Sequence, residues 1–113
     1  KTPDGTCRRE FVHVDDIAEA HVLALEKLGD GPGSRAYNIG AGIVASVSEV
    51  VDTVRKVTAT PVKSVDAPRR PGDPPVLEAD SARIRAELDW KPEYTALESI
   101  VETAWRWASA PKY

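Results

Sequence analysis

Residues 10–28 read EFVHVDDIAEAHVLALEKL, a strand pattern followed at once by a helical pattern, and this pairing decides the fold class. Residues 10–14 alternate in the manner of a short strand. Apolar side chains then recur at helical spacing as far as a closing glycine, and Asp15 or Asp16 can cap the first turn. We therefore expect a strand over residues 10–14 and a helix over residues 16–28.

The next part of the chain repeats this order of elements. Residues 36–40 (AYNIG) form a second strand pattern, and Ser46 with Glu49 forms a capping box in which each side chain satisfies an orphan backbone donor. Valines continue one apolar stripe from that box to about residue 57, and residues 62–65 can form a third strand. Short strands and helices thus alternate over the first half of the sequence.

The last part of the chain is predicted to be helical. Asp80 can cap a helix over residues 81–88, and residues 95–98 (TALE) have the pattern of a second capping box at the start of a final helix. Trp105 and Trp107 flank the apolar stripe of that helix, so we interpret them as packing residues. The whole pattern predicts an α/β fold, and 113 residues leave room for a modest core.

Composition excludes several classes of function. The chain carries 15 basic and 18 acidic residues, a formal charge of −3, and no basic arm, so nucleic acid is not an expected partner. No segment approaches the ~20 apolar residues that span a bilayer, and the first residues lack a signal-peptide core, so we expect no membrane contact and a cytoplasmic location. The single cysteine, Cys7, predicts no internal disulfide and no metal cluster, and we expect it to be a small apolar filler.

Residues 67–73 (APRRPGD) combine cations, a rigid backbone and one acceptor, which is typical of a binding loop. The prolines fix φ and push the preceding residues toward extended backbone, so Arg69 and Arg70 should point to opposite sides. Gly72 permits a turn, and Asp73 can accept hydrogen bonds from hydroxyls beside an anion that an arginine holds. The combination fits a diphosphate attached to a sugar or ribose. A solvated linker with surface ion pairs is the competing interpretation.

Other motifs carry less weight. Residues 40–45 (GAGIVA) match the G-x-G-x-x-G/A dinucleotide pattern between a strand and a helix. Asn38 interrupts the aliphatic run of a buried parallel strand, and the helix begins only after Ser46, so we predict a structural turn instead. His13 and His21 show no metal-ligand spacing, and a structural role is expected for both. The chain shows no complete catalytic set.

Five motifs follow one another in an order that is far more specific than any one of them: residues 4–18 (DGTCRREFVHVDDIA), 20–28 (AHVLALEKL), 37–40 (YNIG), 67–73 (APRRPGD) and 88–92 (LDWKP). Together they resemble the C-terminal third of the UDP-glucose 4-epimerase family, which belongs to the extended short-chain dehydrogenases/reductases. The resemblance implies the C-terminal part of a Rossmann-type fold. Residues 1–45 would be the tail of the NAD-binding lobe, with its last strand and helix, and residues 46–113 the small substrate-binding lobe.

The resemblance also implies roles for individual residues. Arg9 and Arg70 match the two arginines that contact the diphosphate of the substrate, and Asp73 matches the carboxylate that holds the ribose hydroxyls. Leu77 matches a variable wall position whose size influences tolerance of N-acetylated sugars. Glu10 stands where the family usually has aspartate. Of the two loop arginines, the resemblance therefore implies that Arg70, and not Arg69, contacts the diphosphate.

The activity implied by the resemblance is the interconversion of UDP-glucose and UDP-galactose in galactose metabolism. In the family, bound NAD transiently oxidises C4 of the sugar, the keto intermediate rotates, and hydride returns to the other face. The NAD fingerprint and the catalytic Tyr-x-x-x-Lys of the family are not in this sequence. We therefore assign this chain no catalytic, cofactor-binding or metal-binding residue, and expect it to be inactive and to bind no NAD alone. The implied partners are a UDP-hexose, the N-terminal Rossmann lobe and, for the full-length enzyme, a second copy in a homodimer.

Three other interpretations stay open at this stage. A related nucleotide-sugar epimerase, dehydratase or decarboxylase would use a similar C-terminal lobe. A binding module without catalysis would need the same loop and measurable affinity by itself. A minimal dinucleotide-binding unit would use residues 40–45 and respond to NAD rather than to UDP.

Overall fold

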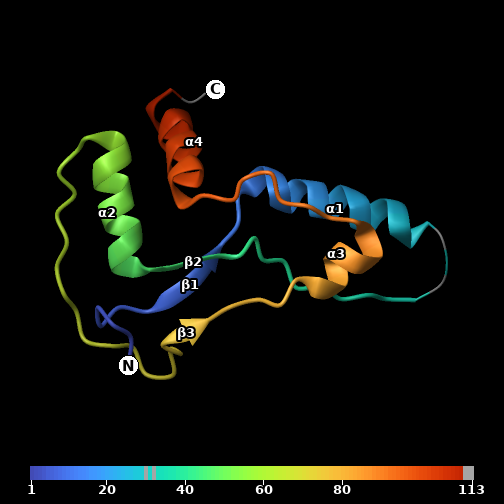
Figure 1. Ribbon diagram of the computed structural model, residues 1–113, viewed down its shortest axis with the longest axis horizontal. Coiled ribbons are helices and arrows are strands. Elements are labelled where there is room, and N and C mark those ends of the chain that lie inside the picture. Colours follow the sequence, from blue (N-terminus) through green and yellow to red (C-terminus); the bar gives the residue numbers. More distant parts are fainter. Residues whose placement is uncertain (30, 32, 111–113) are drawn as a thin grey trace.

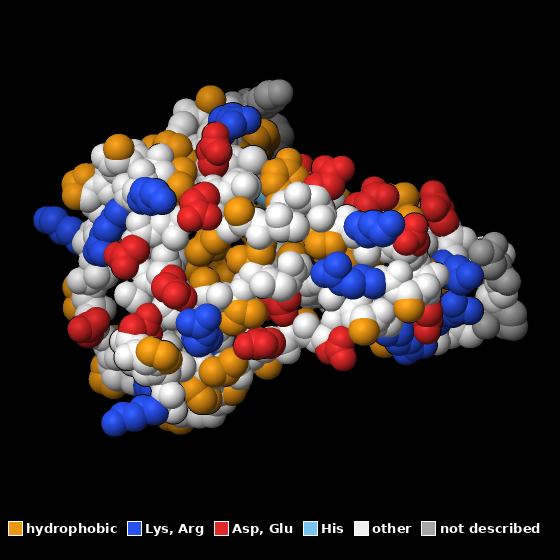
Figure 2. All heavy atoms as spheres, viewed as in Figure 1, with side chains coloured by type: hydrophobic (Ala, Val, Ile, Leu, Met, Phe, Trp, Pro, Cys, Tyr) orange, Lys and Arg blue, Asp and Glu red, His pale blue; other side chains and the backbone are white. Residues whose placement is uncertain are grey.

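The computed structural model describes residues 1–29, 31 and 33–110 of the chain. Its elements, drawn in Figure 1, are β1 (Arg8–Phe11), α1 (Val14–Leu28), β2 (Ile43–Ser46), α2 (Val47–Thr58), β3 (Val76–Leu77), α3 (Ala82–Leu88) and α4 (Leu97–Ser109). The predicted α/β class is confirmed. Over the described residues no helix has the length and apolar character needed to cross a membrane. Basic and acidic side chains are interspersed on the face shown in Figure 2.

The sheet has three strands in the order β2-β1-β3, with β1 in the centre. β1 runs antiparallel to β2 and parallel to β3. The register places Arg9 opposite Ala45 on one side and Leu77 on the other. The central strand begins two residues before the predicted one and ends at Phe11. Arg9, a candidate site residue in the sequence, therefore lies inside the sheet.

Two pairs of helices flank this sheet. α1 packs against α3 at one end of the molecule and α2 packs against α4 at the other (Figure 1). The main buried cluster lies in the first pair and consists of Ala20, Ile84, Leu88 and Trp90. The predicted inward orientation of Ile84 and Leu88 is confirmed. Trp105 and Trp107, expected to pack, are 46% and 47% exposed on α4.

Helix α1 begins two residues before the predicted start, and neither predicted aspartate caps it. The cap is His13, whose Nδ1 accepts from the backbone N–H of Asp15 at 3.0 Å. Asp16 has a different role, because it is buried and its carboxylate accepts the N–H groups of Glu93 at 2.8 Å and Tyr94 at 3.1 Å. This carboxylate fixes the segment between α3 and α4 onto α1.

One of the two predicted capping boxes is present. Ser46 Oγ accepts from the N–H of Glu49 at 3.0 Å, and Glu49 Oε2 accepts from the N–H of Ser46 at 2.6 Å. The box predicted at residues 95–98 is wrong, because α4 is capped by Ala96 without a side-chain hydrogen bond. The helix starts one residue too late for the predicted threonine to reach its free amides.

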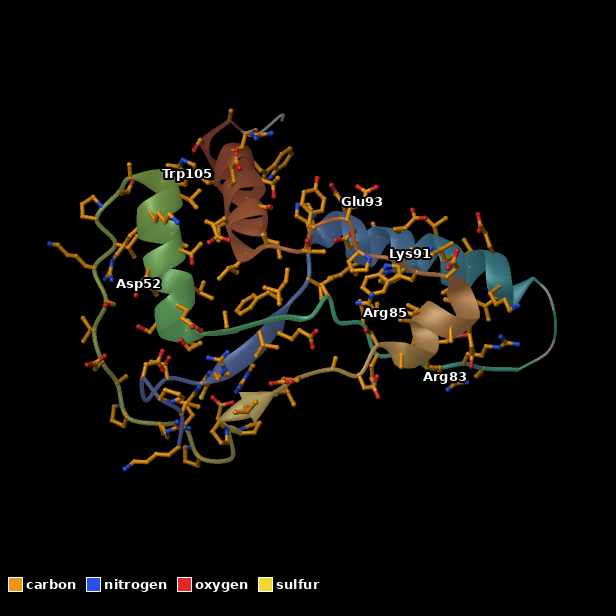
Figure 3. The ribbon with its side chains drawn as sticks, in the orientation of Figure 1. Asp52, Arg83, Arg85, Lys91, Glu93 and Trp105 are labelled. Atoms are coloured by element: carbon orange, nitrogen blue, oxygen red, sulfur yellow. The ribbon has the colours of Figure 1, made fainter. Side chains whose placement is uncertain are left out.

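The predicted strands at residues 36–40 and 62–65 are also wrong, because neither segment pairs with another strand in the described part of the chain. Arg83 and Arg85 of α3 (Figure 3) donate to carbonyls at the two ends of the first segment, at 3.2 and 3.1 Å. Arg55 of α2 donates twice to a carbonyl of the second segment, at 2.9 and 2.6 Å. These extended segments find their hydrogen-bond partners on helices, while the short β2 and β3, which the sequence did not predict, flank β1.

Candidate functional site

The structure brings Arg9 of β1 into contact with Asp73 of the loop at residues 67–73. Arg9 Nη2 lies 2.6 Å from Asp73 Oδ1, and Arg9 Nη1 donates to the carbonyl of Arg8 at 2.7 Å. The two paired side chains are 26% and 27% exposed, so the ion pair is partly shielded from water. Residues 64 positions apart in the sequence thus meet at one site.

A tight turn places Arg70 next to the same carboxylate. The N–H of Asp73 faces the carbonyl of Arg70 at 3.4 Å, Pro71 and Gly72 occupy the central positions, and Gly72 has φ +80°. Proline followed by a residue with positive φ is the pattern of a type II turn, which glycine adopts without strain. Arg70 Nη2 lies 3.7 Å from Asp73 Oδ2 with its side chain 86% exposed, so its guanidinium faces solvent beside the Arg9 ion pair.

Arg69 has other partners than Arg70, in agreement with the predicted divergence. Arg69 Nη1 donates to Cys7 Sγ at 3.7 Å, and Nη2 donates to the carbonyl of Gly5 at 3.4 Å. The thiol of Cys7 in turn donates to Asp73 Oδ2 at 3.8 Å. Cys7 therefore makes polar contacts at the site, whereas the sequence predicted a small apolar filler.

The arginine cluster, as we call Arg9, Arg69, Arg70 and Asp73, has more positive than negative charge. Three guanidinium groups meet one carboxylate directly or through the thiol of Cys7, which leaves an excess of two positive charges. Guanidinium groups bind phosphate oxygens through paired, charge-assisted hydrogen bonds. The cluster is therefore chemically suited to an anionic ligand with more than one phosphate oxygen.

An open hollow of about 310 Å³ lies beside the cluster. Arg9 and Glu10 of β1, Asn38, Ile39 and residues 77–79 line it. Leu77 is 57% exposed there and is the register partner of Arg9 in β3. Of the residues singled out in the sequence, Leu77 shares the hollow with Arg9, while Arg70 and Asp73 approach Arg9 from the loop.

Glu10 was noted in the sequence only as a departure from a family pattern, and the structure gives it two partners. Its Oε1 accepts from the N–H of Gly42 at 2.8 Å, and its Oε2 accepts from the N–H of Ala79 at 2.7 Å. Both donors are backbone groups outside regular strands. Sequence spacing contains no signal for such a contact, because the partners are 32 and 69 residues away.

The dinucleotide-like run at residues 40–45 has the geometry of a turn leading into β2. Gly42 has φ +77°, and the third small residue, Ala45, is buried in the strand rather than packed in a helix. The first N–H groups of α2 already have partners inside the chain: Cys7 O at 3.0 Å, Thr6 Oγ1 at 3.1 Å and Ser46 Oγ at 3.0 Å. A pyrophosphate needs such amides free, so the run does not fit a dinucleotide.

His13 has the structural role expected of it. Its Nδ1 accepts a backbone N–H, so Nε2 carries the proton and donates to Thr103 Oγ1 of α4 at 2.7 Å. Its ring also stacks on Tyr94, with centroids 3.6 Å apart. Among the described residues no three histidine, cysteine or acidic side chains are grouped so that they could hold a metal ion.

Two carboxyl groups away from the cluster have shifted pKa values. The hydroxyl of Ser46, followed by the amide and hydroxyl of Thr6, lowers the pKa of Asp4. The hydroxyl of Tyr37 at 2.6 Å, followed by the guanidinium of Arg83, lowers the pKa of Glu87. Both groups tie separate segments of the chain together, so their shifts reflect the fold rather than catalysis.

Comparison with known proteins shows similarity in both sequence and fold. The profile of the NAD dependent epimerase/dehydratase family matches residues 1–40. A UDP-glucose 4-epimerase of Azospirillum brasilense is 51% identical over 106 residues, covering 94% of this chain and 30% of that protein. One of Corynebacterium glutamicum is 49% identical over 109 residues, covering 96% and 33%. A solved UDP-glucose 4-epimerase from Bifidobacterium longum in complex with NAD+ and UDP has TM-score 0.88 at 35% identity, over 96% of this chain and 32% of that one.

This chain therefore matches one part of proteins of the NAD dependent epimerase/dehydratase family. Within that family it is similar to UDP-glucose 4-epimerases, which confirms the resemblance drawn from the five motifs. The chain spans about a third of the length of the relatives it matches, and so corresponds to one part of such a protein.

Proposed function

We propose that this chain is the C-terminal, nucleotide-sugar-binding part of an enzyme that interconverts UDP-glucose and UDP-galactose in galactose metabolism. Arg9 and Arg70 bind the diphosphate, Asp73 accepts hydrogen bonds from the ribose hydroxyls, and Leu77 forms the wall beside the sugar. This part of the protein holds the substrate, and the groups that react with the sugar lie elsewhere in the complete enzyme.

The observation that carries the proposal is the convergence of Arg9, Arg70 and Asp73. If the loop were a solvated linker, it would have no contact with the sheet. Its Asp73 Oδ1 instead lies 2.6 Å from Nη2 of Arg9 in the central strand. Cations from two separate segments can contact a diphosphate from two sides, and a carboxylate between them can accept from neighbouring hydroxyls. That set of groups matches a nucleoside diphosphate better than a single phosphate.

The energy available from the cluster is modest. Charge-assisted hydrogen bonds contribute about 1.5 to 3 kcal/mol each, so Arg9 and Arg70 together supply about 3 to 6 kcal/mol before ordering costs are subtracted. A millimolar dissociation constant corresponds to about 4 kcal/mol. The chain alone should therefore bind UDP very weakly, and the complete protein should add further contacts.

NAD is the cofactor expected of the complete enzyme, and this chain does not offer its site. The amides at the start of α2 are occupied by Cys7, Thr6 and Ser46, so residues 40–45 leave no cradle for a pyrophosphate. We place the cofactor site in the remainder of the protein and a homodimer interface there as well. On this division residues 1–45 belong with the NAD-binding lobe, and α3 joins the smaller lobe to it by packing on α1.

Substitution of Arg70 by alanine in the complete enzyme tests the proposal. The KM for UDP-glucose and the dissociation constant of UDP should both rise at least about tenfold, the factor that corresponds to about 1.4 kcal/mol. Arg106→Ala is a matched control, because that arginine makes an exposed ion pair with Glu102 on α4. Unchanged UDP binding in the Arg70 variant would show that the cluster does not hold the nucleotide.

A further inference from the structure

Glu10 is the neighbour of Arg9 on β1, and both oxygens of its carboxylate bind backbone amides. The amide of Gly42 lies in the turn before β2, and the amide of Ala79 lies two residues after the end of β3. The ladder between β1 and β3 ends at Leu77. The carboxylate therefore extends the attachment of these segments to β1 beyond the reach of strand pairing.

Gly40 is required by this arrangement, because the carboxylate of Glu10 occupies the space where a side chain would lie. A Cβ on Gly40 would come within 2.7 Å of the carboxyl carbon and of Oε2. The carbonyl of Gly40 accepts from Arg85 Nη2 at 3.1 Å, which holds this peptide group from another direction (Figure 3 shows Arg85). Since two amides fix the carboxylate, it cannot move aside without losing a hydrogen bond.

The segments that Glu10 holds form two walls of the hollow beside the arginine cluster. One wall consists of Asn38 and Ile39, which directly precede the turn, and the other consists of residues 77–79. The first wall leads through the turn into β2, the second begins at the end of β3, and these two strands flank β1 on different sides. The reach of the Glu10 side chain therefore sets the separation of the two walls.

We propose that Glu10 is a positioning residue that sets the width of this hollow, and thereby decides which sugars joined to the nucleoside diphosphate the site accepts. The proposal rests on the proposed function, because Arg9 must bind the diphosphate for the sugar to reach the hollow. Glu10 needs no contact with the ligand. The position of Leu77, and not only its size, then limits the substituents of the sugar.

Three variants of the complete enzyme test this role. Glu10→Gln keeps the length of the side chain but offers one acceptor in place of two, because its amide nitrogen faces an N–H donor. Glu10→Asp is one methylene shorter and cannot reach both amides. Gly40→Ala forces the carboxylate aside. Each variant should change the ratio of kcat/KM for UDP-N-acetylglucosamine and UDP-glucose at least about tenfold, mainly through KM, as expected for a methylene-sized change in a pocket wall.

A second readout separates positioning from loss of fold. The dissociation constant of UDP alone should stay within about twofold in each variant, because the diphosphate is bound by groups that these changes leave in place. Adding Gly40→Ala to Glu10→Asp should have less effect on the ratio than Gly40→Ala alone, since the shorter side chain leaves room for the new Cβ. Glu26→Gln, an exposed change on α1, is the matched control and should leave the ratio unchanged.

The outcomes distinguish this proposal from the one on which it rests. If the unmodified enzyme binds no UDP, the proposed function fails and the hollow is not a sugar site. If it binds UDP but the ratio stays constant in both Glu10 variants, the proposed function stands and the role of Glu10 is wrong. If kcat/KM fell equally for both sugars and UDP also bound more weakly, Glu10 would have only a structural role. That result would also overturn the proposal.

Discussion

Replacing Asp73 by asparagine should strengthen the binding of inorganic diphosphate, although it removes a residue of the proposed site. Asp73 Oδ1 lies 2.6 Å from Arg9 Nη2, where an oxygen of the ligand would otherwise bind, so a diphosphate must displace the carboxylate. The Arg9 guanidinium keeps its charge in the variant, so what is lost is the ion-pair part of the contact, about 0.2 to 1 kcal/mol for a partly exposed pair. The exchange therefore becomes easier by about 0.2 to 1 kcal/mol, or about 1.4- to 5-fold in affinity.

UDP should respond differently from diphosphate, because the asparagine also weakens the hydrogen bonds proposed for the ribose hydroxyls. The gain at the diphosphate and the loss at the ribose should roughly cancel, so the affinity ratio of diphosphate to UDP is the quantity to follow. Isothermal titration with diphosphate, UDP and uridine on the complete enzyme, saturated with NAD to fill other pyrophosphate sites, measures this ratio at fixed salt.

The matched control for this experiment is Asp52→Asn on α2, labelled in Figure 3, which changes the net charge equally. It should leave both affinities unchanged apart from a small effect of total charge. If Asp73→Asn bound diphosphate no better than this control, then Asp73 does not compete for Arg9. The assignment of the diphosphate to Arg9 would then be wrong.

Three further predictions concern the framework of the site. Asp16→Asn should lower the free energy of unfolding by about 1.5 to 3 kcal/mol, because one buried backbone amide loses a charged acceptor, and urea denaturation measures it. Ser46→Ala should cost about 0.5 to 2 kcal/mol through loss of the α2 cap, and Ser46→Thr should restore most of that in the same assay; an equal loss in both variants would contradict the capping argument. The lowered pKa of Glu87, caused first by the Tyr37 hydroxyl, means that its stabilising contribution is present above its ordinary value of 4.5 and is lost as the pH falls through the lower folded value. Glu87→Gln should therefore flatten the fall in urea midpoint with acid, and an unchanged pH profile would show that Glu87 does not contribute.

The helices could be predicted from the sequence because their signals are local. The apolar spacing in α1 and the Ser46 capping box in α2 each involve residues within one or two turns. The strands could not, because an extended segment becomes a strand only when it has a partner. Residues 36–40 look as strand-like as residues 8–11, yet only the second segment pairs with other strands, while Arg83 and Arg85 bind the first.

The candidate site was predictable in part for a similar reason. The residue types in the loop at residues 67–73 are enough to predict an anion-binding segment. The turn at Gly72 follows from the spacing of proline and glycine. Its meeting with Arg9 depends on a contact between distant segments, and only the family resemblance indicated it. The contacts of Glu10 had no such indication, because Gly40 in a Gly-Ala-Gly run is equally well explained by an ordinary turn.

The central strand links these results, because its charged side chains each hold a different segment. Arg8 donates to a carbonyl of β2 and to the capping glutamate of α2, Arg9 binds the loop at residues 67–73, and Glu10 binds the turn before β2 and the segment after β3. The main buried cluster lies between α1 and α3, away from the strands. Polar contacts from β1 therefore largely define how the segments around the sheet are arranged. Conservative changes in β1 should therefore alter ligand discrimination before they alter the overall stability of the fold.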